Sequence, residues 1–250
     1  MDIQPTYEEQ PSAQGTNKTV WWVAGTGCAL ALCFCLILSG LGIYSLYNSS
    51  VLKGFGPPTV TVPPVASVDY HTHFRPNGAS LGNPNAPVKI EIYSDFQCPY
   101  CRFFWRDTEE LIFKNYVATG KVYFTYHSMG AFIGDESQKA AEAAYCAGDQ
   151  EKFWEYHDIL FANQGAENSG AFSDNNLTGF AQTLNLDMTA FNTCFSGGKY
   201  TERAKKDRVE ATAAGVKATP TFLINGTIIE GSQPYENFKN VIDDALIGGG

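Results

Sequence analysis

The segment from Val88 to Cys101 constrains the fold more than any other stretch of the chain. It reads VKIEIYSDFQCPYC, and apolar residues occupy every second position of its first half. This alternation predicts a strand that ends in a short polar turn. Pro99 stands where the first turn of a helix tolerates proline, because the missing N–H would have no partner there. The sequence therefore predicts a strand followed directly by a helix that begins at the two cysteines.

This arrangement predicts a reactive dithiol. Cys98 would be the N-cap residue of the helix, and Cys101 would lie one turn further along. A thiolate at Cys98 would then face unpaired N–H groups at the positive end of the helix dipole. That environment lowers the pKa of a cysteine below its ordinary value of ~8.5.

Composition excludes some functions and indicates a compartment. The chain has 250 residues, 44% of them hydrophobic, which is enough for a buried core. Its 17 basic and 26 acidic residues give a net charge of −9, and no basic patch is visible, which argues against a nucleic-acid partner. Three of the seven cysteines lie in an apolar run, and an even number lies beyond it, as suits an oxidising compartment. These four are Cys98, Cys101, Cys146 and Cys194.

The N-terminal part predicts a membrane anchor. Residues 1–19 are polar and read as a cytoplasmic tail. Residues 20–47 contain no charged residue, exceed the ~20 needed to cross a bilayer, and carry Trp and Tyr pairs at their ends. Residues 48–82 are rich in Pro and Gly and read as a linker. We expect an uncleaved transmembrane helix that tethers a folded domain over residues 83–250.

The remaining chain predicts two halves separated by helices. An amphipathic helix after Cys101 and a strand over 121–127 complete a β-α-β unit with parallel strands. Helical patterns fill residues 131–214, one of them opening at Asp135. The Asn225-Gly226 pair then predicts a hairpin between strands at 221–224 and 227–229, followed by a last helix. The expected fold is α/β, with a helical insertion between a βαβ and a ββα half.

On these residues the chain resembles the DsbA-type branch of thioredoxin-fold thiol–disulfide oxidoreductases, and in particular its membrane-anchored, BdbD-like members. The resemblance extends from Pro84 to about Ile247 and is carried by APVKIEIYSDFQCPYC, EKFWEYHDILF and GVKATPTFLINGTIIEG. It implies a thioredoxin fold and no bound cofactor.

The resemblance also implies roles for individual residues. Cys98 would be the nucleophile and Cys101 its partner, with Pro99 and Tyr100 between them. Pro220 would be a cis-proline that faces the pair together with Thr219; from the residues alone, an ordinary trans proline opening a strand is the alternative. Many relatives keep a buried carboxylate six residues before the first cysteine, where this chain has Ile92. The candidate for the role of this carboxylate is Asp95, three residues before Cys98. Some relatives bridge cysteines at the positions of Cys146 and Cys194; two free buried thiols are the alternative.

The function implied is disulfide formation in exported polypeptides. The protein would sit in the cytoplasmic membrane as a single-pass protein, with its N-terminus inside and its catalytic domain on the extracytoplasmic side. A quinone-linked membrane protein would reoxidise it.

Two other functions are compatible with the same sequence. One is a thiol reductase or disulfide isomerase that uses the same exchange. The other is a chaperone or binding module in which CPYC forms a passive disulfide. No metal site is expected, because a structural zinc centre needs four ligands and no second cysteine pair has the CxxC spacing.

Overall fold

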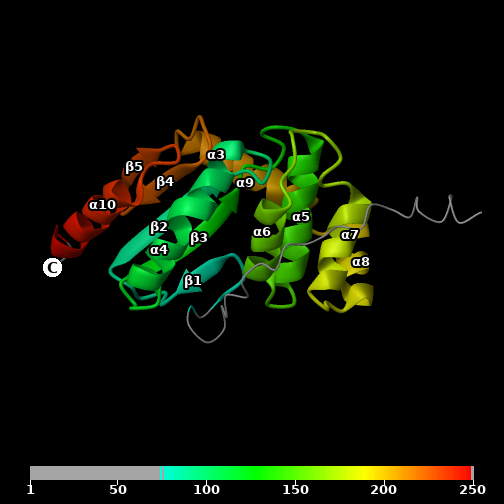
Figure 1. The fold of residues 1–250 in the computed structure, drawn as a ribbon, viewed down its shortest axis with the longest axis horizontal. Coiled ribbons are helices and arrows are strands. Elements are labelled where there is room, and N and C mark those ends of the chain that lie inside the picture. The colour runs from blue at the N-terminus through cyan, green and yellow to red at the C-terminus, as the bar shows by residue number, and fades with distance from the viewer. Residues whose placement is uncertain (1–73, 75, 249–250) are drawn as a thin grey trace, which may run out of the picture. The chain divides into compact units, whose positions relative to one another are not determined.

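The computed structural model describes Phe74 and residues 76–248 of the chain (Figure 1). The predicted tail, the predicted transmembrane helix at 20–47 and most of the predicted linker lie outside these residues. None of the helices within the described residues is both long and apolar enough to cross a bilayer. The elements in chain order are β1 (Ser80–Gly82), β2 (Val88–Ser94), α3 (Pro99–Phe104), η2 (Trp105–Glu109), α4 (Glu110–Ile112), η3 (Phe113–Val117), β3 (Val122–Ser128), α5 (Asp135–Gly148), α6 (Phe153–Ala162), α7 (Asp174–Thr183), α8 (Met188–Ser196), α9 (Thr201–Ala213), β4 (Thr221–Ile224), β5 (Thr227–Glu230) and α10 (Tyr235–Gly248).

The strands form one mixed sheet in the order β1-β3-β2-β4-β5. The two strands of the first half, β2 and β3, are parallel, with Ile90 opposite Phe124. The second half adds β4 antiparallel to β2 and closes with the β4–β5 hairpin. Asn225 and Gly226 both have positive φ at the hairpin turn, as a tight two-residue turn requires. The structure thus confirms the predicted α/β arrangement of a βαβ and a ββα half.

The helix that follows the cysteines is continuous from Pro99 to Val117. Two of its turns, η2 and η3, are π-helical and therefore wider than an α-helical turn. Ile112 and Phe113, on either side of the second junction, are both buried. Phe113 packs against Phe124 of β3 and Trp154 of α6, so this part of the helix contributes to the core.

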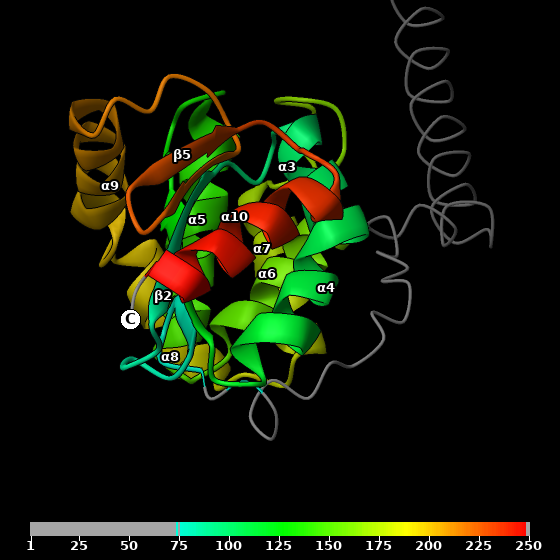
Figure 2. The same ribbon diagram turned by 90° about the vertical axis from the view of Figure 1, so that its left-hand side faces the viewer.

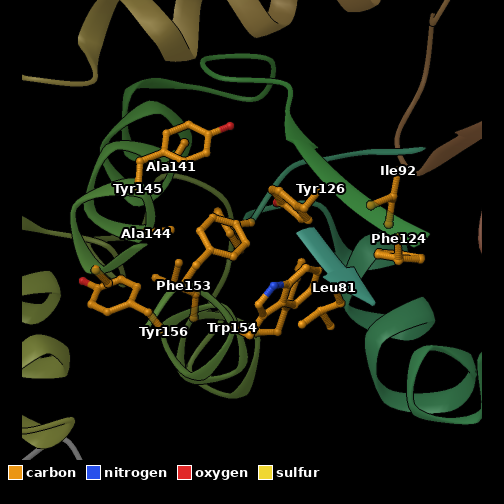
Figure 3. Packing of buried hydrophobic residues seen from close by; sticks show 14 of the residues in the cluster. Leu81, Ile92, Phe124, Tyr126, Ala141, Ala144, Tyr145, Phe153, Trp154 and Tyr156 are labelled. Carbon is orange, nitrogen blue, oxygen red and sulfur yellow. The ribbon is translucent and has the colours of Figure 1, made fainter. Parts of the chain in front are cut away.

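The core lies between one face of the sheet and α6. Figure 3 shows Phe153 and Trp154 of α6 packed between the strand side chains and the small residues of α5. The Trp154 ring contacts Phe124 of β3 edge-on, and Phe153 contacts Tyr126 of the same strand. Opposite residues of β2 and β4, such as Ile92 and Phe222, point toward the same face and are buried. This packing fixes β2, and therefore the start of α3, against the helices.

The helical insertion comprises α5 to α9, and α5 to α8 gather at one side of the sheet (Figure 1). α10 lies beside α4 on the sheet (Figure 2). Phe238 of α10 meets Phe104 of α3 and Phe222 of β4 in one aromatic cluster. The insertion therefore lies between the two halves in sequence without interrupting the sheet.

The sheet begins earlier than the sequence indicates. β1 falls inside the stretch expected to be a linker up to residue 82, and it pairs antiparallel with β3. Leu81 has no exposed surface, and Phe74 is buried as well. The folded part therefore starts before residue 83, because this short strand covers an edge of the sheet and adds side chains to the core.

Candidate active site

The two cysteines lie at the junction of β2 and α3. Cys98 is the N-cap residue of α3 with an extended backbone, and Pro99 is the first helical residue. The Cys98 carbonyl accepts the first helical hydrogen bond, from the Arg102 N–H at 3.2 Å. Cys98 contributes no side-chain cap to the helix. Its sulfur is therefore available for other contacts at the end of the helix where the N–H groups are unpaired.

Both thiols are free and buried, and their hydrogen bonds differ. In its thiol form, Cys98 Sγ donates to the Thr219 carbonyl oxygen at 3.3 Å. Cys101 Sγ accepts a hydrogen bond from the Asp95 N–H at 3.5 Å. Cys98 thus faces the segment before β4, whereas Cys101 faces the end of β2.

The two thiols have opposite pKa shifts. Hydrogen bonds lower the pKa of Cys98 from 9.0 to about 6, against the effect of burial. The largest comes from the Cys101 side chain, and smaller ones come from the Thr219 side chain and from the N–H groups of Cys101 and Tyr100. Burial raises the pKa of Cys101 well above 9.0, and the neighbouring Cys98 raises it further. One sulfur is therefore a stable thiolate near neutral pH, and the other stays protonated and donates to it.

Asp95 is a buried carboxyl beside the pair. Its Oδ1 accepts hydrogen bonds from the Gln97 N–H at 2.8 Å and from Ser137 Oγ at 2.7 Å, and its Oδ2 accepts one from the Ile133 N–H at 3.3 Å. Burial, with a smaller contribution from the charge of Cys98, raises the pKa of Asp95 to about 6, against the effect of these hydrogen bonds. Ile92, six residues before Cys98, is an apolar core residue.

The segment before β4 completes the site. The peptide bond between Thr219 and Pro220 is cis, and Thr219 is buried against Cys98. On the outer side, Pro99 and Tyr100 are exposed, and Tyr100 has 60% of its surface in solvent. The structure therefore brings Cys98, Cys101, Asp95 and Thr219 together and leaves Tyr100 facing outward.

Cys146 and Cys194 lie elsewhere, in the helical insertion. They form a disulfide between α5 and α8, with their Cα atoms 5.8 Å apart. Neither residue takes part in the cysteine pair of the site.

Sequence reasoning missed the side chains that hold the site from the insertion. Ser137 at the start of α5 donates to Asp95, and Gln164 after α6 donates to the carbonyls of Phe96 and Cys98. Neither residue belongs to a local motif, because both contacts join segments more than 40 positions apart. No periodicity or spacing in the sequence would have found them.

The described residues contain one cluster with metal-ligand chemistry, formed by Glu109, His157 and Asp158. Asp158 Oδ1 already accepts a hydrogen bond from Trp105 Nε1 at 2.8 Å and lies 3.2 Å from His157 Nδ1. Burial raises the pKa of Glu109 well above its ordinary value. These three residues supply one donor fewer than the four ligands of a structural zinc site.

Comparisons with known proteins show similarity over most of the described residues. The family model described as Thioredoxin matches residues 75–244. The chain is 26% identical over 215 residues to the probable disulfide bond formation protein D of Bacillus anthracis. The alignment covers 84% of this chain and 91% of that protein. The crystal structure of oxidised BdbD from Bacillus subtilis superposes with a TM-score of 0.63 at 24% identity, covering 68% of this chain and 94% of that chain.

A second kind of relative is much longer than this chain. The Na(+)/H(+) antiporter NhaA 1 of Salinispora arenicola is 34% identical over 167 residues, which cover 67% of this chain but 24% of that protein. The chain therefore spans about a quarter of the length of the two Salinispora antiporters that it matches, and about a third of that of Herminiimonas arsenicoxydans.

Proposed function

Because the chain belongs to the thioredoxin family, in its DsbA-type branch, we propose that it is a protein disulfide oxidoreductase that forms disulfides in exported proteins through Cys98 and Cys101. The observation that carries the proposal is the contrast between the two thiols. A depressed pKa at Cys98 stabilises the reduced pair, and a stable reduced form makes the oxidised pair a strong oxidant.

The proposed reaction has two exchange steps. A substrate thiolate attacks Cys98 Sγ of the oxidised pair; the Cys98–Cys101 bond breaks, and its electrons leave on Cys101 Sγ, which takes up a proton. The second substrate thiolate then attacks the substrate sulfur of the mixed disulfide, and Cys98 leaves as a thiolate. The substrate loses two electrons and gains a disulfide, and the enzyme ends with the thiolate–thiol pair.

The neighbours of the pair have supporting roles in this proposal. Cys101 stabilises the departing Cys98 thiolate, because its side-chain hydrogen bond is the largest cause of the low pKa. Asp95 titrates close to neutral pH beside the pair and takes part in its proton exchange. Thr219 offers its backbone to an extended substrate, and the exposed Tyr100 contacts the substrate's side chains.

The low pKa of Cys98 favours an oxidase over a reductase. A reductase must give up its electrons readily, which a stabilised thiolate opposes. The disulfide between Cys146 and Cys194 supports the proposal that the protein functions in an oxidising compartment, because such bonds do not persist in most cytosols. A non-enzymatic binding module would have no need for two thiols with such different pKa values.

We place the protein in the cytoplasmic membrane, with residues 20–47 as a single anchor and the domain on the extracytoplasmic side. The apolar 20–47 segment supports this placement. Its substrates would be exported polypeptides with free thiols. A quinone-linked membrane protein would accept the two electrons and restore the Cys98–Cys101 disulfide.

The test is oxidation of a peptide with two cysteines by one equivalent of the full-length oxidised protein. We expect one peptide disulfide to form for each protein disulfide lost. The Cys98→Ser variant should form none, whereas a Cys146→Ala/Cys194→Ala variant should retain the reaction. Equal peptide oxidation by wild type and Cys98→Ser would refute the proposal.

A further inference from the structure

Hydrogen bonds join residues 96–98, which we call the Cys98 turn, to the segment between α6 and α7. Gln164 Nε2 donates to two carbonyls of the turn, to that of Phe96 at 2.7 Å and to that of Cys98 at 3.0 Å. The connection is reciprocal, because Arg102 Nη1 of α3 donates to the Gln164 carbonyl at 3.3 Å. Gln164 thus holds the backbone on both sides of Gln97, the residue that precedes Cys98.

The residue between these two carbonyls is fixed by the same segment. Gln97 is buried, and its Oε1 accepts the Asn168 N–H at 2.6 Å. Asn168 itself lies against Gly134, where an added Cβ would come within 2.1 Å of Asn168 Oδ1. Residues 164–168 therefore contact the Cys98 turn and the start of α5, next to the Ile133 N–H that bonds Asp95.

We propose that Gln164 is a positioning residue for the thiol–disulfide exchange of Cys98, and that through it the helical insertion sets the reactivity of the site. The effect on thiol–disulfide exchange rests on the proposed function, whereas the hydrogen bonds of Gln164 do not depend on it. Gln164 does not touch the sulfur in the described contacts. It acts by holding the backbone of residues 96–98.

The physical reason lies in what the Cys98 thiolate needs. Its low pKa depends on the Cys101 side chain and on N–H groups at the start of α3, all of which require a fixed N-cap geometry. Without Gln164, the Phe96 and Cys98 carbonyls lose a donor, and the turn gains freedom to move the sulfur away from these groups. Hydrogen-bond donors to a thiolate act over short distances, so a small displacement weakens them.

The test compares Gln164→Met with wild type in the full-length reduced protein. Methionine keeps the length of the side chain and removes both donors. The readout is the thiolate absorbance at 240 nm as a function of pH, measured with Cys98 and Cys101 both present. We expect the apparent pKa of Cys98 to rise by up to about one pH unit, which corresponds to the loss of one of the hydrogen bonds that the fixed turn directs at the sulfur.

The chain provides a matched control in Gln150. Its amide also joins two segments, because Nε2 donates to the Asp187 carbonyl at 3.1 Å and Oε1 accepts the Asp187 N–H at 2.7 Å. This connection lies within the helical insertion and does not involve the cysteine pair. Gln150→Met should lower the melting temperature and leave the Cys98 pKa unchanged.

A second variant keeps the test informative if Gln164→Met does not fold. Gln164→Asn keeps the amide but is one methylene shorter and reaches only one of the two carbonyls. Its pKa should fall between those of wild type and Gln164→Met. The inference is overturned if both Gln164 variants titrate as wild type does while their melting temperatures fall as in Gln150→Met, because Gln164 would then be structural only.

This outcome is separable from failure of the proposed function. Oxidation of the dithiol peptide by wild type tests the function and does not involve Gln164. If wild type oxidises the peptide and the Gln164 variants leave the Cys98 pKa unchanged, only the inference fails. If wild type does not oxidise the peptide and the pKa still rises in the variants, only the function fails.

Discussion

Cys98 Sγ lies 3.3 Å from the carbonyl oxygen of Thr219, a residue 121 positions away in the sequence. This contact joins the two halves of the fold, because Cys98 ends the β2–α3 junction of the first half and Thr219 precedes β4 of the second. The sulfur thus lies between the start of a helix and a fixed backbone segment. A substrate that pairs with the Thr219 segment would bring its own sulfur next to Cys98.

Replacing Cys101 should change the acidity of Cys98 according to what remains at position 101. The Cys101 side chain is the largest cause of the low Cys98 pKa. In Cys101→Ala, which has no donor, the Cys98 pKa should rise from about 6 toward 9.0. In Cys101→Ser, the hydroxyl still donates, and the rise should be smaller. Titration of the thiolate absorbance at 240 nm measures both, and equal values in the two variants would contradict this assignment.

The stability of the reduced protein should depend on pH through Cys98. The folded-state pKa of about 6 is below the ordinary value of 9.0, so thiolate formation stabilises the folded state. This contribution is fully present above the unfolded-state pKa and is lost as the pH falls through about 6. Relative to Cys98→Ser, the reduced wild type should therefore gain unfolding free energy as the pH rises from 6 to 9. Urea unfolding at several pH values would show this, and a flat difference would contradict it.

Asp95→Asn should act on the cysteine pair through charge. The Asp95 carboxylate and the Cys98 thiolate repel each other, since the charge of Cys98 raises the pKa of Asp95. The interaction is mutual, so removal of the carboxylate should lower the pKa of Cys98 below its wild-type value. Asp207→Asn is the control, because Asp207 is another buried carboxylate and bonds Tyr145 instead of the site. If both variants shift the Cys98 pKa equally, the effect does not come from Asp95.

Much of the framework that carries the site could be predicted from local patterns in the sequence. The alternation in β2, the proline after Cys98 and the Asn225-Gly226 turn each specify a backbone conformation within a few residues. Helix α5 does begin at the predicted Asp135, although Gly134 is its N-cap residue and no side chain caps it. Local patterns thus predict the order of the elements more reliably than they predict the hydrogen bonds at the ends of the helices.

Other features depend on contacts that no local pattern encodes. β1 has three residues and follows a stretch rich in Pro and Gly, so it becomes a strand only because β3 is beside it. The hydrogen bond from Ser137 to Asp95 and those from Gln164 to the Cys98 turn depend on how the insertion packs against the sheet. Sequence alone therefore indicated the cysteines but not the side chains that hold them.

The disulfide of the insertion should contribute to stability and not to chemistry. Cys146 and Cys194 are 48 positions apart, and cross-linking a loop of this length limits the freedom of the unfolded chain. The Cys146→Ala/Cys194→Ala variant should lose about 4 kcal/mol of unfolding free energy in a chain-entropy treatment. Its Cys98 pKa should equal that of wild type. A changed pKa in this variant would show that the disulfide also controls the site.

The equilibrium of the Cys98–Cys101 pair with glutathione tests the central claim most directly. The full-length protein is incubated in buffers of defined reduced and oxidised glutathione, and the fraction of reduced pair is measured after acid quenching and thiol alkylation. A stabilised Cys98 thiolate predicts a reduction potential well above the ~−270 mV of thioredoxin, in the range of oxidising family members. A potential at or below that of thioredoxin would contradict the proposal that the folded protein stabilises its reduced form to drive disulfide formation.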